Sequence, residues 1–198
     1  MGKLADLTFE HYKFLRKKED LYHQTIDAVI KIVWLFAYDD FWNLLIKTYN
    51  TEDDVYAKKI GSLWSTLKLS SPELTVPVEF QLEGLEQPYQ SAILSLQQLS
   101  NSTSIESKLK CLTQAATKII SSVDTYWAKQ SAPRAITVGA DEILPLMIYV
   151  VVKARVPHIF SEGIFMELFI DENQSIQQEG YVLATFQMAL KEIYEMKK

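Results

Sequence analysis

Apolar residues recur at intervals of three and four along much of the chain, which is the spacing of one face of an α-helix. The clearest case follows Thr103, where the apolar positions are Ile105, Leu109, Leu112, Ala116, Ile119, Val123 and Trp127. A second case covers about 181–196, where they are Val182, Phe186, Ala189, Ile193 and Met196. Both segments are therefore predicted to be helices that pack through one face.

Further helices are predicted at 4–21, at 22–49, from 51 to about 69, at 88–99 and from 157 to about 169. Two start signals support these helices: Thr51 as an N-cap and Pro88 at a first helical position. Thr103 with Glu106 fits a capping box, which supports the helix after Thr103. Prolines predict a loop over 71–87, interrupted by a short helix near 82–85. Loops are also predicted at 130–137, which contains Pro133, and at 171–175.

The stretch from Ala140 to Ala154 is apolar nearly all round, which is typical of a buried helix. It is longer than a usual strand and too short to cross a bilayer, which needs roughly 20 apolar residues. Asp141 and Glu142 stand at its start, and Pro145 has no N–H to donate to the Asp141 carbonyl. The simpler interpretation is that Asp141 caps the helix; the alternative is a functional acid on a loosened turn.

Composition agrees with an all-α fold. Of the 198 residues, 48% are hydrophobic, enough for a sizeable core, and Gly and Pro are only six each, few for a fold rich in tight turns. We expect a layered helical bundle of about seven to nine helices, with residues 1–87 as an N-terminal layer packed on a core of residues 88–198. The net charge of −5 argues against nucleic-acid binding, and a single cysteine, Cys111, excludes an internal disulfide.

Other chemical candidates have simple structural explanations. Asp39 and Asp40 could bind a metal, but they lack a third ligand nearby in sequence, so a polar helix face is preferred. His158 is interpreted as a partly exposed residue at a helix start, and Cys111 as a packing residue. The run Arg16–Asp20 could contact phosphates or a membrane, but its acids largely cancel its bases. We expect no metal and no cofactor.

Three spaced motifs change this picture. The segment Gly139–Tyr149 reads Gly-Ala-Asp-Glu-Ile-Leu-Pro-Leu-Met-Ile-Tyr, Pro88–Leu99 reads Pro-Tyr-Gln-Ser-Ala-Ile-Leu-Ser-Leu-Gln-Gln-Leu, and Ser104–Cys111 contains Lys-Leu-Lys-Cys. Together with Gly180-Tyr181 they resemble the Vps-nine (vacuolar protein sorting nine) domain, over about 88–193. Ile105 stands where that family has proline.

The resemblance implies a guanine nucleotide exchange factor for the Rab-five subgroup of small GTPases, peripheral on early endosomes and without a transmembrane segment. It implies that Asp141 is the acidic finger that expels GDP and magnesium, with Glu142 as the second choice. It also implies that Tyr181 bonds the GTPase switch region beside an apolar groove shaped by Pro145. Tyr149, Ala184 and Thr185 complete the predicted partner contacts.

The chain departs from the family pattern just before and within its last predicted helix. Gln177 and Gln178 replace Gly-Glu, Ala184 stands where the family usually has threonine, and Thr185 comes one place late. These departures motivate an alternative, a module of the same fold that binds a Rab GTPase without exchanging its nucleotide.

Overall fold

The computed structural model describes residues 2–17, 19–130 and 135–196, and within these ranges it is helical, with no strand. The all-α prediction is therefore confirmed for the described chain. Its elements are α1 (Gly2–His11), η1 (Lys13–Lys17), α2 (Glu19–Thr48), α3 (Asn50–Thr66), η2 (Val78–Phe80), α4 (Gln90–Gln97), η3 (Gln98–Asn101), α5 (Ile105–Ala128), α6 (Ala140–Ala154), α7 (Ile159–Phe169), α8 (Glu172–Ser175) and α9 (Gln178–Glu195), where η marks a 3₁₀ helix.

The chain divides into two compact units, residues 1–44 and 45–198, with the boundary inside α2. In the first unit the predicted helix over 4–21 is wrong, because α1 ends at His11 and η1 follows before α2 begins. The reason is packing: the Phe9 ring stacks on Tyr22 with centroids 4.7 Å apart, so the chain must turn back between them. Phe9 is only 2% exposed. Asp39 and Asp40 are exposed on an uninterrupted α2, as a polar face requires.

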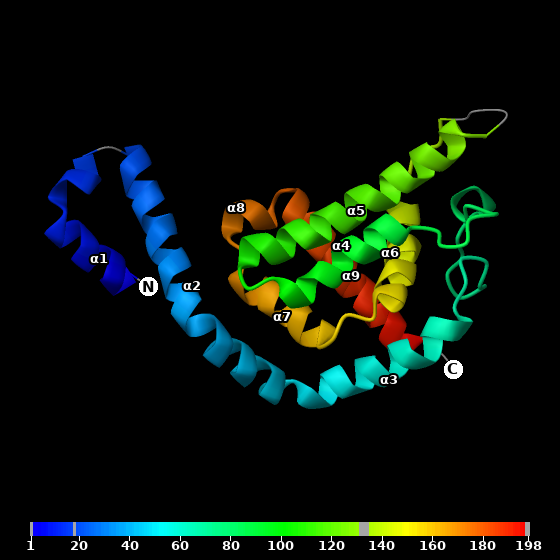
Figure 1. Cartoon of the computed structure of the whole chain (residues 1–198), viewed down its shortest axis with the longest axis horizontal. Helices are drawn as coiled ribbons and strands as arrows, with labels where there is room; N and C mark the ends of the chain where they lie inside the picture. Colours follow the sequence, from blue (N-terminus) through cyan, green and yellow to red (C-terminus); the bar gives the residue numbers. More distant parts are fainter. Residues whose placement is uncertain (1, 18, 131–134, 197–198) are drawn as a thin grey trace. The chain divides into compact units, whose positions relative to one another are not determined.

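The second unit is organised around α6, as its apolar sequence predicts. α6 packs against α3, α4, α5 and α9, and α9 also contacts α5 and α7 (Figure 1). Burial on all sides of α6 removes its aliphatic side chains from water, which is the main favourable term in folding. The fully buried residues of this helix are Leu146, Met147, Val150, Val151 and Val152.

Several predicted helix starts are displaced by one or two residues. The cap of α5 is Ser104, whose hydroxyl accepts the N–H of Ser107 at 3.2 Å, and not Thr103. α4 begins at Gln90 because Tyr89 is left-handed, with φ of 60°. Buried Tyr89 is fixed there by its hydroxyl, which donates to the Phe80 carbonyl at 2.5 Å. Thr51 lies inside α3 rather than at its cap.

The connecting segments also differ in part from the prediction. The short helix expected at 82–85 is instead a turn, and a 3₁₀ helix lies slightly earlier, at η2. The segment expected to be a loop at 171–175 forms α8, because the Asp171 carboxylate accepts the Gln174 N–H at 2.8 Å. Pro133 of the predicted loop at 130–137 lies outside the described residues.

Candidate functional site

A groove of about 340 Å³ lies where the start of α6 meets α9. Its walls combine one acid, one tyrosine and a set of apolar groups. The lining residues are Ala140, Asp141, Ile143, Leu144, Tyr181, Thr185 and Met188. The structure therefore brings together Asp141 and Tyr181, the two residues for which the sequence predicts the central roles, although they are 40 positions apart in the chain.

The two acids at the start of α6 are used differently. The Glu142 carboxylate accepts the backbone N–H of Gly139 at 2.8 Å and so satisfies a donor at the helix start. The Asp141 side chain is exposed, and within the described ranges it has no hydrogen-bond or ion-pair partner. The capping interpretation of Asp141 is therefore wrong, because Glu142 makes the capping bond. Asp141 is left as a charged group at the groove.

Tyr181 lies in the first turns of α9 and is 52% exposed. Thr185, one turn later, is buried, and its hydroxyl donates to the Tyr181 carbonyl at 2.9 Å. Met188 follows on the same face of the helix and is 54% exposed. Its place in the groove was missed at the sequence level, although its spacing of seven from Tyr181 is the signal that could have found it.

Three other predicted partner residues do not line this groove. Tyr149 is buried beside the ring of Tyr89, with centroids 6.3 Å apart, and burial raises the pKa of its phenol. Pro145 is half-buried in the turn that follows Asp141. Ala184 is exposed on α9, one turn after Tyr181, so it borders the face that carries the tyrosine.

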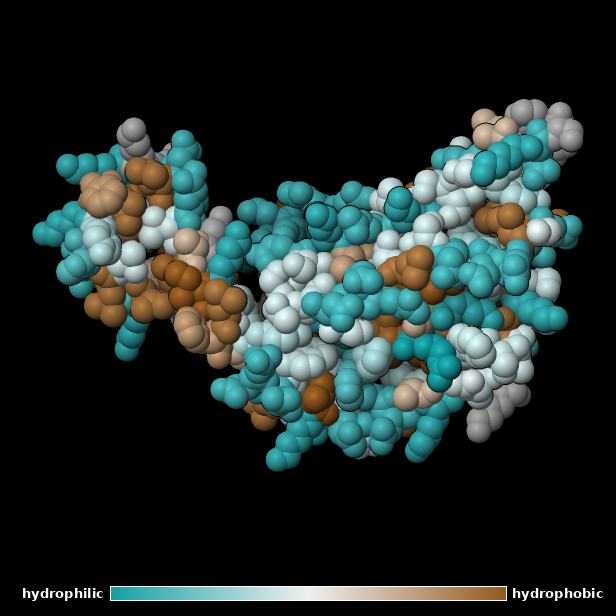
Figure 2. Space-filling view, viewed as in Figure 1, coloured by the Kyte–Doolittle hydropathy of each residue, from teal (hydrophilic) through white to brown (hydrophobic). Residues whose placement is uncertain are grey.

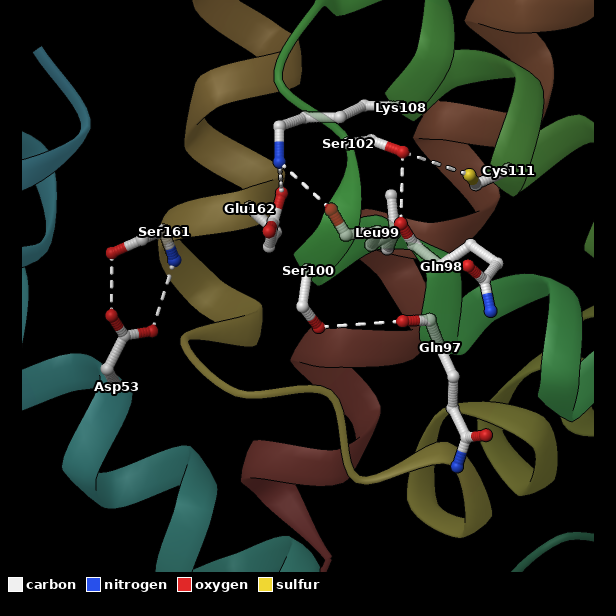
Figure 3. A network of polar contacts seen from close by, with 10 residues as sticks. All are labelled: Asp53, Gln97, Gln98, Leu99, Ser100, Ser102, Lys108, Cys111, Ser161 and Glu162. Carbon is white, nitrogen blue, oxygen red and sulfur yellow. Dashed lines mark hydrogen bonds and ion pairs between the residues drawn. The ribbon is translucent and has the colours of Figure 1, made fainter. Parts of the chain in front are cut away.

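The core also contains an ion pair that the sequence did not predict (Figure 3). The Lys108 ammonium lies 2.6 Å from the Glu162 carboxylate and donates to the Leu99 carbonyl at 3.2 Å. Both side chains are almost fully buried. Burial raises the pKa of Glu162 to about 7 although Lys108 opposes the shift, and burial lowers the pKa of Lys108. The pair joins α5, η3 and α7.

A second buried acid, Asp53 of α3, caps α7 from outside that helix. Its carboxylate accepts the Phe160 N–H at 3.1 Å. It also accepts the N–H of Ser161 at 3.1 Å and the Ser161 hydroxyl at 2.6 Å (Figure 3). The His158 ring, which is 43% exposed, lies 3.2 Å from the same carboxylate. Ser161 donates to the acid and not to the histidine, so this cluster is a helix cap and not a nucleophilic relay.

A second groove exists in the described structure, but it lacks the acid and the tyrosine of the α6–α9 groove. A larger groove of about 610 Å³ lies between residues 83–91 and α5, but its lining is mainly hydroxyl and amide groups, without Asp141 or Tyr181. Over the part of the chain that the structure describes, no three or more metal-ligating side chains gather. Over the same part, no helix is both long and apolar enough to cross a membrane.

Comparison with known proteins gives the family. Residues 89–198, more than half of the chain, match the vacuolar sorting protein 9 (VPS9) domain. The chain belongs to the VPS9 domain family. This match contains both Asp141 and Tyr181, and it confirms the resemblance drawn from the motifs. The VPS9 domain is a family of Rab guanine nucleotide exchange factors, so its general partner is a small GTPase.

The chain is also similar to the human protein "VPS9 domain-containing protein 1", with 26% identity over 171 residues. The alignment covers 77% of this chain and 27% of that protein. The chain thus spans about a quarter of the length of this relative.

Proposed function

We propose that this VPS9 domain is a guanine nucleotide exchange factor for the Rab-five subgroup of small GTPases, with Asp141 as its acidic finger. The observation that carries the proposal is that one groove holds exposed Tyr181 together with the Asp141 carboxylate, which has no partner among the described residues. Glu142 is occupied by its bond to Gly139, which leaves Asp141 as the acid available to a partner.

The chemistry of release calls for such an acid. A small GTPase holds its nucleotide through a lysine and a magnesium ion on the phosphates. An exchange factor must bind the empty GTPase better than the loaded one, and linkage then weakens nucleotide binding by the same factor. A carboxylate presented to that site repels the phosphates, competes for the lysine and disturbs the metal. In support of this role, no protein group neutralises Asp141 among the described residues.

The groove walls would supply affinity for the GTPase. Ile143 and Leu144 on α6 and Met188 on α9 give apolar surface, and the Tyr181 hydroxyl gives a hydrogen-bond group beside it. Apolar pockets with a few placed polar groups are typical binding sites. In this proposal Tyr181 bonds the switch region of the GTPase, and Pro145 and Ala184 border the contact. The structure gives Tyr149 no place there, and Thr185 acts through its bond to the Tyr181 backbone.

The same proposal includes the organisation of the chain. Residues 88–198 would form the exchange core, and residues 1–87 a helical layer that supports it. Of that layer, α3 packs on α6, α7 and α9 and caps α7 through Asp53, which supports the proposal for this helix. A Rab-five-subgroup substrate would bring the protein to the surface of early endosomes.

The test is release of a fluorescent guanine nucleotide from a panel of Rab GTPases. We expect the chain to accelerate release from Rab-five-subgroup members. Asp141→Asn, which keeps the side-chain shape and removes the charge, should abolish the acceleration. A matched control is Glu106→Gln, which alters an exposed acid in the first turn of α5, outside the groove. Acceleration that persists in Asp141→Asn would exclude the acidic finger, and a response confined to other Rab subgroups would exclude the proposed substrate.

A second candidate function is binding without exchange. Gln177, Gln178 and Ala184 depart from the family pattern, and Thr185 bonds within its own helix, so in this candidate the hydrogen bond of the family's threonine is missing. A chain that binds a Rab GTPase yet leaves its nucleotide release rate unchanged would support this candidate. Because binding and release are measured separately, the two functions are distinguished by one protein preparation.

A further inference from the structure

The first unit of the chain carries large apolar side chains on its surface (Figure 2). In α1 and η1 the exposed ones are Leu4 at 45%, Leu7 at 60% and Phe14 at 58%, together with Tyr12 between the two helices at 51%. Single exposed apolar residues are ordinary, but four within eleven positions concentrate exposed apolar area on this short segment.

The charges around these residues are mainly positive. Residues 1–17 contain four bases and two acids, whereas the rest of the chain contains 16 bases and 23 acids. Arg16 lies 3.9 Å from Asp6, which uses one of the two acids. Lys3, Lys13 and Lys17 are exposed and form no ion pair with any described residue. The segment is therefore a basic island in an acidic protein.

The structure also resolves why the sequence suggested otherwise. If residues 4–21 formed one helix, the acids of the run Arg16–Asp20 would largely cancel its bases. Arg16 and Lys17 instead end η1, whereas Glu19 and Asp20 begin α2. The bases therefore share an element with Phe14 and follow Leu4 and Leu7, and the acids belong to a separate helix.

We propose that α1 and η1 form a docking surface for an anionic membrane, with Leu4, Leu7 and Phe14 entering the interface and Lys3, Lys13 and Lys17 facing the lipid headgroups. A short helical segment with apolar residues and neighbouring lysines lies in the membrane interface, and its binding grows with buried apolar area and with attraction to anionic lipid. The exposed lysines complement the negative headgroups of an anionic membrane, which favours a lipid surface over an uncharged protein groove. The proposal does not depend on nucleotide exchange.

The α2 helix supplies a matched control within the same unit. Leu35 and Phe36 are more exposed than any apolar residue of the proposed surface, at 80% and 82%. Two acids, Asp39 and Asp40, follow them one turn later on the exposed side of the helix. If exposed apolar area alone caused membrane binding, substituting Leu35 and Phe36 would weaken binding most. If the basic island is required, substituting this α2 pair would change binding little.

The experiment is co-sedimentation of the chain with vesicles of phosphatidylcholine alone, or with about a third of phosphatidylserine. We expect binding to the anionic vesicles only, weakened when salt is raised from about 0.05 M to about 0.5 M. Lys13→Glu with Lys17→Glu, and separately Leu7→Glu with Phe14→Glu, should each lower the bound fraction at least tenfold at limiting lipid. Leu35→Glu with Phe36→Glu should change the bound fraction by no more than about twofold, because in the proposal neither residue contacts the membrane.

Three outcomes would overturn the proposal: equal binding to neutral vesicles, full binding by the lysine variant, or loss of binding in the α2 control. A fourth is a protein interface. If the chain ignores vesicles but forms a dimer in ultracentrifugation that Leu7→Glu with Phe14→Glu dissociates, then the surface binds protein. Circular dichroism of each variant, with unchanged helix content, ensures that a loss of binding is not a loss of folding. Nucleotide release in solution should be the same for all three variants, so failure here leaves the exchange proposal intact.

Discussion

At the scale of single residues, neighbouring acids at one helix start have separable uses. Glu142 bonds the Gly139 amide, and Asp141 has no partner in the described chain. A carboxylate at an N-terminal turn gains from the helix dipole whichever of the two positions it occupies. The hydrogen bond therefore decides which acid is structural, and the geometry, not the residue type, leaves Asp141 for the partner.

Exchanging each acid for alanine tests that division. Asp141→Ala should abolish nucleotide release while lowering the unfolding free energy little, since the side chain makes no bond among the described residues. Glu142→Ala should retain most exchange and lose about 0.5–2 kcal/mol of stability, the usual cost of a lost cap. Release assays and urea denaturation measure the two effects. Equal loss of exchange in both variants would show that the wrong acid was chosen.

Tyr181 and Ala184 test the second helix of the groove. Tyr181→Ala should reduce exchange strongly, because it removes the exposed polar group opposite Asp141. Ala184→Thr adds a hydroxyl one turn later, and a net hydrogen bond of about 0.5–1.5 kcal/mol would raise exchange up to about tenfold. The readout is the release rate from one responsive Rab. Normal exchange by Tyr181→Ala would remove α9 from the site, and a large loss in Ala184→Thr would favour the non-exchanging module.

At the scale of elements, the sequence predicted the helices that local residues determine and missed the features that contacts between distant residues determine. α5 and α9 were predicted because their apolar residues recur at intervals of three and four, and α6 because its run is apolar nearly all round and longer than a usual strand. The break after His11 was missed because neither proline nor glycine marks it and the stacking of Phe9 on Tyr22 enforces it. The cap of α7 was missed because its acceptor, Asp53, is 107 residues before Phe160. For the site, motifs indicated Asp141 and Tyr181, but only the fold shows that they share a groove with Met188.

The start of α9 offers an element-scale prediction at Gly180. A Cβ added there would lie 1.8 Å from the Ser175 carbonyl oxygen, so α8 and α9 approach each other as closely as only glycine allows. Gly180→Ala must shift the first turn of α9, which carries Tyr181, and we expect exchange to fall at least tenfold with secondary structure retained. The control is Gly61→Ala in α3, where an added Cβ would meet no atom within 4 Å beyond the adjoining backbone of its own helix. That change should stabilise the fold by about 0.4–1 kcal/mol and leave exchange unchanged. Full activity of Gly180→Ala would show that α8 does not position the tyrosine.

At the scale of the whole molecule, stability should depend on pH through the buried pair of Lys108 and Glu162. Burial raises the pKa of Glu162 from 4.5 to about 7, so between these values the folded protein holds a proton that the unfolded chain has released. The unfolding free energy contributed by Glu162 therefore falls as pH rises through this window, and it is constant above it. Lys108 acts in the opposite sense at higher pH. Burial lowers its pKa, so just below the ordinary value of 10.5 the unfolded chain holds a proton that the folded protein has released. In that range the unfolding free energy rises with pH.

The two windows place the lowest contribution of this pair above about pH 7, where both groups are charged and desolvated. Replacing the pair by Lys108→Met with Glu162→Leu should then be neutral or stabilising at about pH 8, as for other buried ion pairs, whereas either change alone should cost about 3–5 kcal/mol by leaving one polar partner uncompensated. Between about pH 5 and 7 the wild type should lose about 2–3 kcal/mol relative to the double variant. Urea denaturation at several pH values measures this difference, in which the titration of all other groups cancels. Parallel curves for the two proteins would show that Glu162 stays ionised in the fold, with its ion pair to Lys108 outweighing the cost of burial.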